Sequence, residues 1–235
     1  MKIIAGIPAH NNRRCIGSLV LMIEMEKYAD EVIVVDDGST DDTVEIVEKC
    51  NASAKETNPL VTSIIKQENA GEGVAIRKLI EEAKKRDADI LVIIEANCGY
   101  NTLFLFSQKR KPVLKEKTKE KTQSSFGKAF LLKKRFVIGS RFTGDNKAEN
   151  KKKMSYTERV WAKTSNFVAN IGATTKVSDS QSGFRAISKY AMDMISLNRD
   201  NESVKSEMVA DAEKQMIRIQ EVGIGIWMKG SEQWF

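Results

Sequence analysis

Short apolar runs alternate with helical patterns along the first hundred residues of the chain. The runs are rich in β-branched side chains and predict four buried strands, over residues 2–8, 31–35, 61–67 and 89–94. Apolar residues at helical spacing predict three helices between them, over residues 12–28, from a cap at Ser39 to Cys50, and over residues 73–86. This alternation is typical of an α/β fold with a mostly parallel central sheet and helices on both faces.

The second half of the chain has a less regular pattern. It predicts strands over residues 136–140 and 216–222, and helices over residues 156–171 and 203–215. The 235 residues include only three prolines and fourteen glycines, and no linker divides them, so we expect a single domain.

Composition narrows the classes of chemistry that are open to this protein. The only histidine is His10, which excludes Ser-His-Asp triads and multi-histidine zinc sites. The three cysteines, Cys15, Cys50 and Cys98, are odd in number and are expected to be free thiols. A net charge of +6 permits an anionic partner but selects none. The apolar runs are far shorter than the roughly 20 residues that cross a bilayer, so we expect a soluble, cytoplasmic protein.

Polar residues follow four of the predicted strands, at the carboxyl ends where open parallel sheets bind ligands. These stretches are residues 8–12 (Pro-Ala-His-Asn-Asn), 36–39 (Asp-Asp-Gly-Ser), 95–97 (Glu-Ala-Asn) and 139–141 (Gly-Ser-Arg). Carboxylates suit ribose hydroxyls, the edge of a base or a divalent cation, and an arginine suits a phosphate. The pattern predicts a site of nucleotide size.

Five motifs resemble those of the family-2 glycosyltransferases and occur in the same order as in that family. They are residues 7–12 (Ile-Pro-Ala-His-Asn-Asn), 34–43 (Val-Val-Asp-Asp-Gly-Ser-Thr-Asp-Asp-Thr), 69–75 (Asn-Ala-Gly-Glu-Gly-Val-Ala), 137–142 (Val-Ile-Gly-Ser-Arg-Phe) and 179–185 (Asp-Ser-Gln-Ser-Gly-Phe-Arg). The last two are similar to those of the dolichyl-phosphate sugar synthases. The resemblance extends from Met1 to about Ile224 and implies a single-domain GT-A fold.

The resemblance also implies an activity, in which a sugar moves from a UDP- or GDP-sugar to a polyprenyl phosphate with inversion at the anomeric carbon. A phosphate monoester has a second pKa near ~6, so such an acceptor needs no general base. The Glu-Asp dipeptide and the Gln-x-x-Arg-Trp motif of family members that act on hydroxyl acceptors are absent. The implied donor-binding half is about residues 1–100, and the implied acceptor-side half is about residues 136–224.

The matched motifs imply roles for particular residues. Glu95 and Asn97 would hold Mg²⁺ or Mn²⁺, and they would act in catalysis together with Arg141 and Arg185, which would contact phosphates. The expected donor-binding residues are Pro8, His10, Asn12, Val35, Asp36, Asp37, Ala96 and Gln181.

Several ligand-facing positions depart from the family pattern. The metal-binding Asp-x-Asp is here Glu95-Ala96-Asn97, and the lysine of the glycine-rich turn is Glu72. These departures favour an alternative in which the chain is a weak or inactive relative that binds nucleotide sugar or a protein partner. Residues 101–135 do not follow the family and carry a basic run, Lys109 to Lys121, which fits either a solvated face or contact with lipid phosphate at a membrane surface. A nucleic-acid binder is disfavoured because no recognition motif accompanies the charge.

Overall fold

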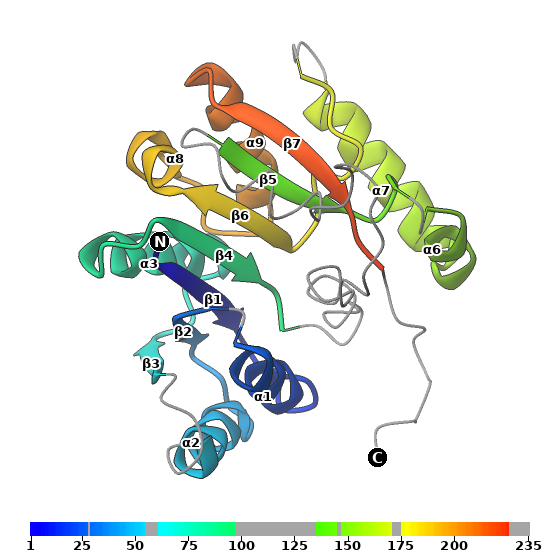
Figure 1. The fold of residues 1–235 in the computed structure, drawn as a ribbon. Coiled ribbons are helices and arrows are strands. Elements are labelled where there is room, and N and C mark those ends of the chain that lie inside the picture. Colours follow the sequence, from blue (N-terminus) through cyan, green and yellow to red (C-terminus); the bar gives the residue numbers. More distant parts are fainter. Residues whose placement is uncertain (28, 55–60, 97–134, 145–146, 171–174, 226–235) are drawn as a thin grey trace, which may run out of the picture.

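A computed structural model describes residues 1–27, 29–54, 61–96, 135–144, 147–170 and 175–225 of the chain (Figure 1). Seven strands in this part of the chain form one sheet in the order β3-β2-β1-β4-β6-β5-β7. Their bounds are β1 (Ile3–Ala9), β2 (Glu31–Asp37), β3 (Val61–Gln67), β4 (Ile90–Ile94), β5 (Arg135–Ser140), β6 (Phe184–Ser188) and β7 (Arg218–Gly223). β1 to β4 are parallel, β6 is antiparallel to both β4 and β5, and β7 is parallel to β5. The predicted mostly parallel α/β sheet is confirmed.

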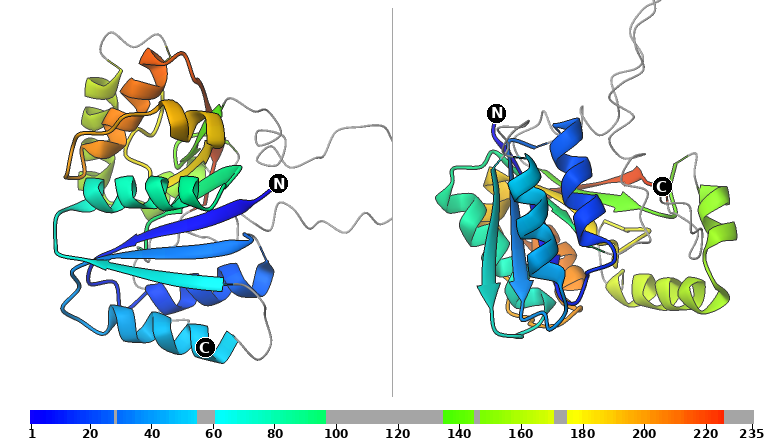
Figure 2. Two further views of the ribbon diagram at one scale, coloured as in Figure 1. Left: turned by 90° about the vertical axis from the view of Figure 1, so that its left-hand side faces the viewer. Right: turned by 90° about the horizontal axis from the view of Figure 1, so that it is seen from below.

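Helices cover both faces of this sheet (Figure 2). Their bounds are α1 (Ile16–Glu26), α2 (Thr43–Ala54), α3 (Glu72–Lys85), α6 (Lys147–Lys153), α7 (Tyr156–Ala169), α8 (Lys189–Met194) and α9 (Val204–Lys214). Apolar side chains of α1 and α2 pack in one hydrophobic cluster, and those of α3, α8 and α9 pack in the other. The central strands lie between the two clusters.

Strand β2 shows why the predicted strands have no polar face. Val32 and Val34 point into the cluster under α1, whereas Ile33 and Val35 point into the cluster under α3. Successive side chains of a strand alternate between the two faces, and here both faces are covered, so residues 32–35 of the strand are all apolar. Polar side chains occur only at the two ends of the strand, at Glu31 where it begins and at Asp36 and Asp37 where it ends.

The structure corrects the expected start of the second helix. α2 begins at Thr43 and not after a cap at Ser39. The Ser39 hydroxyl instead accepts a hydrogen bond from the backbone N–H of Asn11, at 2.9 Å. The carboxylate of Asp41 accepts the Thr43 N–H at 3.0 Å and so satisfies a donor at the helix start. The sequence pattern did not predict β6, α6 or α8, which are all short elements.

The expectation of free thiols is correct for Cys50, which is buried, and wrong for Cys15, which takes part in a disulfide. Spacing along the chain does not show which cysteines the fold brings together, so the sequence alone could not reveal this bond. Within the described ranges, no helix has both the length and the apolar character needed to cross a bilayer.

Candidate active site

Three loops meet at the carboxyl ends of β1, β2 and β3. His10 Nδ1 donates to the carbonyl oxygen of Asp37 at 2.7 Å, which joins the ends of β1 and β2. The side-chain oxygen of Asn12 accepts the His10 N–H at 2.8 Å, and the Asn12 N–H donates to Thr43 Oγ1 at 2.8 Å. The predicted residues His10 and Asn12 therefore lie together with Asp36 and Asp37 at one edge of the sheet.

Asp37 holds the glycine-rich turn that precedes α3. Its buried carboxylate accepts hydrogen bonds from Gln67 Nε2 at 2.7 Å, from the Ala70 N–H at 2.9 Å and from the Gly71 N–H at 2.8 Å. Gly71 has φ of 99°, and a Cβ there would lie 2.3 Å from the carbonyl oxygen of Asp200. The turn therefore requires glycine at this position, and Asp37 fixes its shape.

Asp36 differs from Asp37 in how its oxygens are used. It is only 4% exposed, and its Oδ2 accepts one long hydrogen bond, from the Ser39 N–H at 3.3 Å. Its buried Oδ1 has no hydrogen-bond partner among the described residues. A buried carboxylate oxygen without a partner is costly, and an N–H or O–H group of a ligand would satisfy it.

A second set of charges lies at the end of β4. Lys205, in the first turn of α9, makes ion pairs with Glu95, which directly follows β4, and with Glu72, the first residue of α3, whose Oε1 is 3.0 Å away. The Glu95 N–H donates to the carbonyl oxygen of Gly183 at 3.1 Å. A Cβ at Gly183 would lie 2.1 Å from the Glu95 carboxylate carbon, so only glycine admits this approach.

Burial and the mutual charges shift the pKa values of these three groups. Burial raises the pKa of Glu72 to about 7, a rise that Glu95 reinforces and Lys205 opposes. Burial also acts to raise the pKa of Glu95, but the Lys205 ammonium outweighs it, and the pKa of Glu95 is lowered. The two carboxylates raise the pKa of Lys205 in spite of its burial. Glu95 and Lys205 are therefore both charged at neutral pH.

The two predicted arginines, Arg141 and Arg185, form hydrogen bonds to other groups of the protein. Arg141 Nε and Nη2 each lie 2.7 Å from a carboxylate oxygen of the fully buried Asp179. Arg185 is 1% exposed, and it donates to the carbonyl oxygens of Ser180, Ser182 and Lys205 at 2.6, 3.0 and 2.6 Å. The structure thus places Arg185 on backbone carbonyl groups and not on an open surface where a phosphate would meet it, because β6 carries its side chain into the protein interior.

The remaining predicted residues have mixed placements. Pro8, Val35 and Ala96 are buried. The side chains of Val35 and Ala96 pack in the hydrophobic clusters beneath the carboxyl edge of the sheet. Gln181 Nε2 donates to Ser206 Oγ at 2.6 Å, which links the 179–183 loop to α9. Asn97 and the run from Lys109 to Lys121 lie outside the described residues.

Two residues that sequence reasoning did not assign are central to this arrangement. Asp179 is the first residue of the 179–185 motif, and its buried pairing with Arg141 explains why a carboxylate occurs there. Lys205 had no motif to mark it, since it lies on a helix remote in sequence from both of its partners.

The described residues do not fit a divalent cation at Glu95. The carboxylate predicted as a metal ligand contacts the ammonium group of Lys205, and a cation placed there would lie against a like charge. Within the described ranges, no three His, Cys, Asp or Glu side chains gather as a cation site. Of the two predicted metal ligands, Glu95 is therefore paired with Lys205, and Asn97 lies outside the described residues.

The acidic side chains and the glycine-rich turn lie at the carboxyl edge of an α/β sheet, where proteins of this class bind their ligands. Comparison with known proteins makes the assignment narrower. Residues 5–101 match the family model for glycosyl transferase family 2, so this part of the chain is similar to that family. The predicted resemblance is confirmed.

Two curated relatives match nearly the whole chain. A UDP-N-acetylglucosamine–dolichyl-phosphate N-acetylglucosaminyltransferase of Methanococcus voltae is 28% identical over 228 residues, which cover 93% of this chain and 82% of the relative. An uncharacterised protein of Methanocaldococcus jannaschii is 29% identical over 225 residues, which cover 95% of this chain and 80% of that protein.

Solved structures of a Mycobacterium tuberculosis enzyme share the fold. Glucosyl-3-phosphoglycerate synthase matches with a TM-score of 0.63 at 18% identity, over 99% of this chain and 74% of that one. Its complex with Mn²⁺, UDP and glucosyl-3-phosphoglycerate matches with a TM-score of 0.57 at 19% identity, over 97% and 72% of the two chains. The expected GT-A fold is confirmed.

Proposed function

We propose that this chain transfers a sugar, N-acetylglucosamine foremost, from its UDP conjugate to a polyprenyl phosphate, with inversion at the anomeric carbon. The observation that carries the donor part of the proposal is the buried Oδ1 of Asp36, which has no hydrogen-bond partner in the part of the chain that the structure describes. It lies at the carboxyl edge of a parallel sheet, where a hydrogen-bond donor of a nucleoside would satisfy it.

The choice of donor and acceptor comes from the relatives. The Methanococcus protein, whose similarity covers 93% of this chain, is named for UDP-N-acetylglucosamine as donor and dolichyl phosphate as acceptor. The structural relative from Mycobacterium tuberculosis binds UDP and UDP-glucose. Both favour UDP over GDP as the nucleotide.

The chemistry of this transfer suits the side chains that the fold supplies. An oxygen of the acceptor phosphate attacks the anomeric carbon, the bond from that carbon to the β-phosphate oxygen breaks, and the electron pair leaves on UDP. A phosphate monoester with a second pKa near ~6 is already ionised at neutral pH, so no protein group has to remove a proton. What the protein must supply is position and positive charge near the leaving diphosphate.

Exposed aromatic side chains on α7 support an acceptor that resides in a membrane. Tyr156, Trp161 and Phe167 on this helix are 73%, 66% and 70% exposed. Tyr156 and Phe167 are eleven residues apart, close to three helical turns, so they share one face of the helix. Large aromatic side chains that a soluble core leaves exposed are typical of surfaces that lie at the lipid–water boundary.

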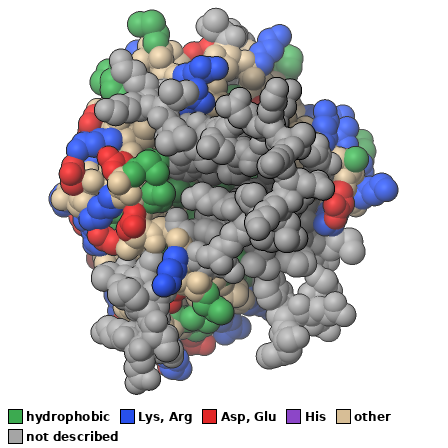
Figure 3. All heavy atoms as spheres, viewed as in Figure 1, with side chains coloured by type: hydrophobic (Ala, Val, Ile, Leu, Met, Phe, Trp, Pro, Cys, Tyr) green, Lys and Arg blue, Asp and Glu red, His purple; other side chains and the backbone are tan. Residues whose placement is uncertain are grey.

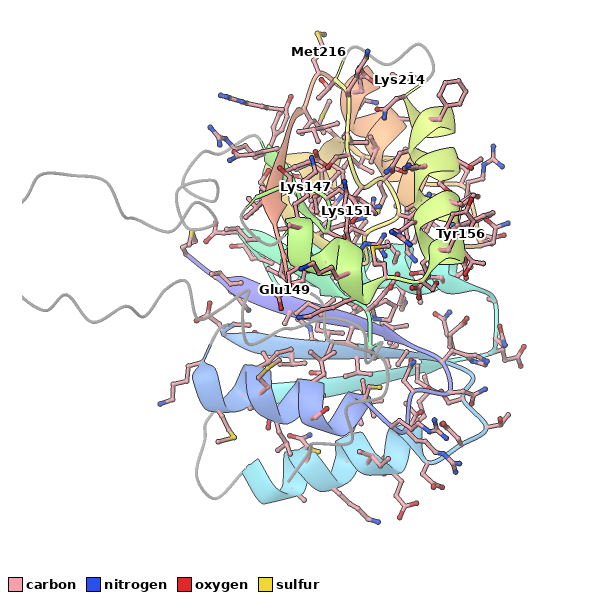
Figure 4. The ribbon with its side chains drawn as sticks, turned by 90° about the vertical axis from the view of Figure 1, so that its right-hand side faces the viewer. Lys147, Glu149, Lys151, Tyr156, Lys214 and Met216 are labelled. Atoms are coloured by element: carbon pink, nitrogen blue, oxygen red, sulfur yellow. The ribbon has the colours of Figure 1, made fainter. Side chains whose placement is uncertain are left out.

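Lysines on the neighbouring helix add the matching charge. Lys147, Lys151 and Lys152 of α6 are exposed, and basic side chains gather at the edge of the molecule formed by α6 and the adjacent part of α7 (Figure 3). Figure 4 shows Lys147 and Lys151 on α6, close to the start of α7 at Tyr156. Lys214 and Met216 lie far from α6, toward the other end of α7. Aromatic and basic side chains together favour a surface of anionic lipid.

Calorimetric titration tests the donor part of the proposal. We expect the protein to bind UDP and UDP-N-acetylglucosamine, and GDP-mannose at least about tenfold more weakly, because a site that hydrogen-bonds one base leaves polar groups unpaired with another. The absence of heat with all three ligands at millimolar concentration would contradict the proposal.

The predicted division of the chain, with the donor bound by residues 1–100 and the acceptor by residues 136–224, belongs to this same proposal.

A further inference from the structure

Lys205 lies between two carboxylates at the edge of the sheet where the proposed donor binds. Its side chain is 11% exposed, and its ammonium group contacts both Glu95 and Glu72. Glu95 extends from the carboxyl end of β4, and Glu72 follows directly on the glycine-rich turn that Asp37 holds. The ammonium group is therefore part of the same edge as Asp36 and Asp37.

The surrounding structure fixes this lysine in place. Arg185 donates to the Lys205 carbonyl oxygen at 2.6 Å, and Gln181 donates to the hydroxyl of the next residue, Ser206, at 2.6 Å. Gly183 allows the Glu95 carboxylate to approach where any larger residue would block it. Three residues of the 179–185 motif thus set the positions of Lys205 and Glu95.

Stability alone does not account for a buried cluster of this kind. Removing two carboxylates and an ammonium from water costs free energy that their mutual attraction often fails to return, and apolar residues would fill the space as well. An ammonium group has three N–H donors, and two carboxylates leave it with capacity for a further acceptor. Lysine in proteins is a common ligand of phosphate.

We propose that Lys205 supplies the positive charge that binds the donor diphosphate, and that this site binds a nucleoside diphosphate without a divalent cation. The inference rests on the proposed function, since it names the group that receives the leaving diphosphate in that reaction. The same ion pair engages the Glu95 carboxylate, which a metal would need, so lysine and metal compete for one position.

The wild-type protein provides the first test and needs no substitution. UDP is titrated into the protein by calorimetry, once in excess EDTA and once in Mn²⁺. We expect dissociation constants that agree within about threefold, because the positive charge is built into the chain. Binding that is lost in EDTA and restored by Mn²⁺ would overturn the inference while leaving the proposed function intact. Absence of binding under both conditions would count against the proposed function itself.

Substitution of the lysine provides the second test. In EDTA, Lys205→Met is expected to weaken UDP binding by about tenfold to a hundredfold, the loss of a charged hydrogen bond. The same variant should bind uridine as the wild type does, since uridine carries no phosphate. Mn²⁺ should restore part of the UDP affinity, because Glu95 is then released to coordinate it.

Controls separate this role from a structural one. Lys214→Met alters an exposed lysine on the same helix and should leave UDP binding unchanged, and Lys205→Arg should retain most of it. Thermal unfolding followed by circular dichroism verifies that each variant is folded. Equal losses of UDP and uridine affinity in Lys205→Met, or no loss of either, would overturn the inference.

Discussion

The two adjacent aspartates at the end of β2 should respond in opposite ways to the same substitution. Asp37→Asn replaces a carboxylate that accepts three hydrogen bonds, two of them from backbone N–H groups of the turn at Ala70 and Gly71. An asparagine has one acceptor oxygen, so its NH₂ group must face one of these donors. Losing a charged hydrogen bond costs about 1.5–3 kcal/mol, and the stranded N–H adds to it, so we expect a loss of about 2–4 kcal/mol in unfolding free energy.

Asp36→Asn removes a charge whose Oδ1 has no described partner and whose Oδ2 accepts a single long hydrogen bond. Its unfolding free energy should change by less than about 1 kcal/mol, because relief of the buried charge offsets the lost bond. UDP affinity should fall about tenfold, since an amide cannot replace a carboxylate as acceptor on both oxygens. Urea unfolding and calorimetry measure the two quantities. Equal destabilisation by both variants, or unchanged UDP affinity in Asp36→Asn, would refute the division of roles.

Two further predictions concern the surface of α7 that we propose to face the membrane and the loop that carries Asp179. Replacing Trp161 and Phe167 by serine should weaken binding to vesicles that contain anionic lipid. The control Met25→Ser, at an exposed position on α1, should leave vesicle binding unchanged. Equal effects of the two changes would exclude α7 as the lipid-facing helix. Burial raises the pKa of Glu221 above its usual 4.5, so the folded state keeps this proton at a pH where the unfolded chain has lost it. Its contribution to stability is present below pH 4.5 and is lost as pH rises through the folded pKa, so the stability of wild type relative to Glu221→Gln should fall over that range in urea titrations. A difference that is constant with pH would contradict this assignment.

The sequence was sufficient to predict the parallel half of the sheet, because its strands are buried on both faces and its helices carry a clear apolar stripe. It did not reveal β6, since this strand has only five residues and its first two, Phe184 and Arg185, end the polar Gln-Ser-Gly-Phe-Arg motif, which gives no strand pattern. The antiparallel position of β6 next to β4 is what brings Gly183 to Glu95. That contact depends on sheet topology and has no local signal.

The sequence predicted that the candidate site residues gather at the carboxyl edge of the sheet, but it did not predict which hydrogen bonds each of them makes. Asp36 and Asp37 are adjacent and equally acidic in sequence, and only their hydrogen-bond partners distinguish a carboxylate that we propose for ligand binding from one that fixes a turn. Arg185 matched a motif, yet its position in a buried strand turns its guanidinium to backbone carbonyl groups. Lys205 could not be predicted, because its pairing with Glu95 joins elements that are distant in sequence.

Transfer of a labelled sugar to lipid is the most direct measurement of the central claim. The protein is incubated with radiolabelled UDP-N-acetylglucosamine and with either polyprenyl phosphate or the corresponding polyprenol in anionic vesicles, and the lipid is extracted. We predict label in the lipid fraction with the phosphate and none with the alcohol, and a rate at least about tenfold lower in Asp36→Asn. A protein that binds UDP-N-acetylglucosamine yet labels no lipid, also when UDP-glucose or GDP-mannose is the donor, would contradict the claim and identify a relative that only binds nucleotide sugar.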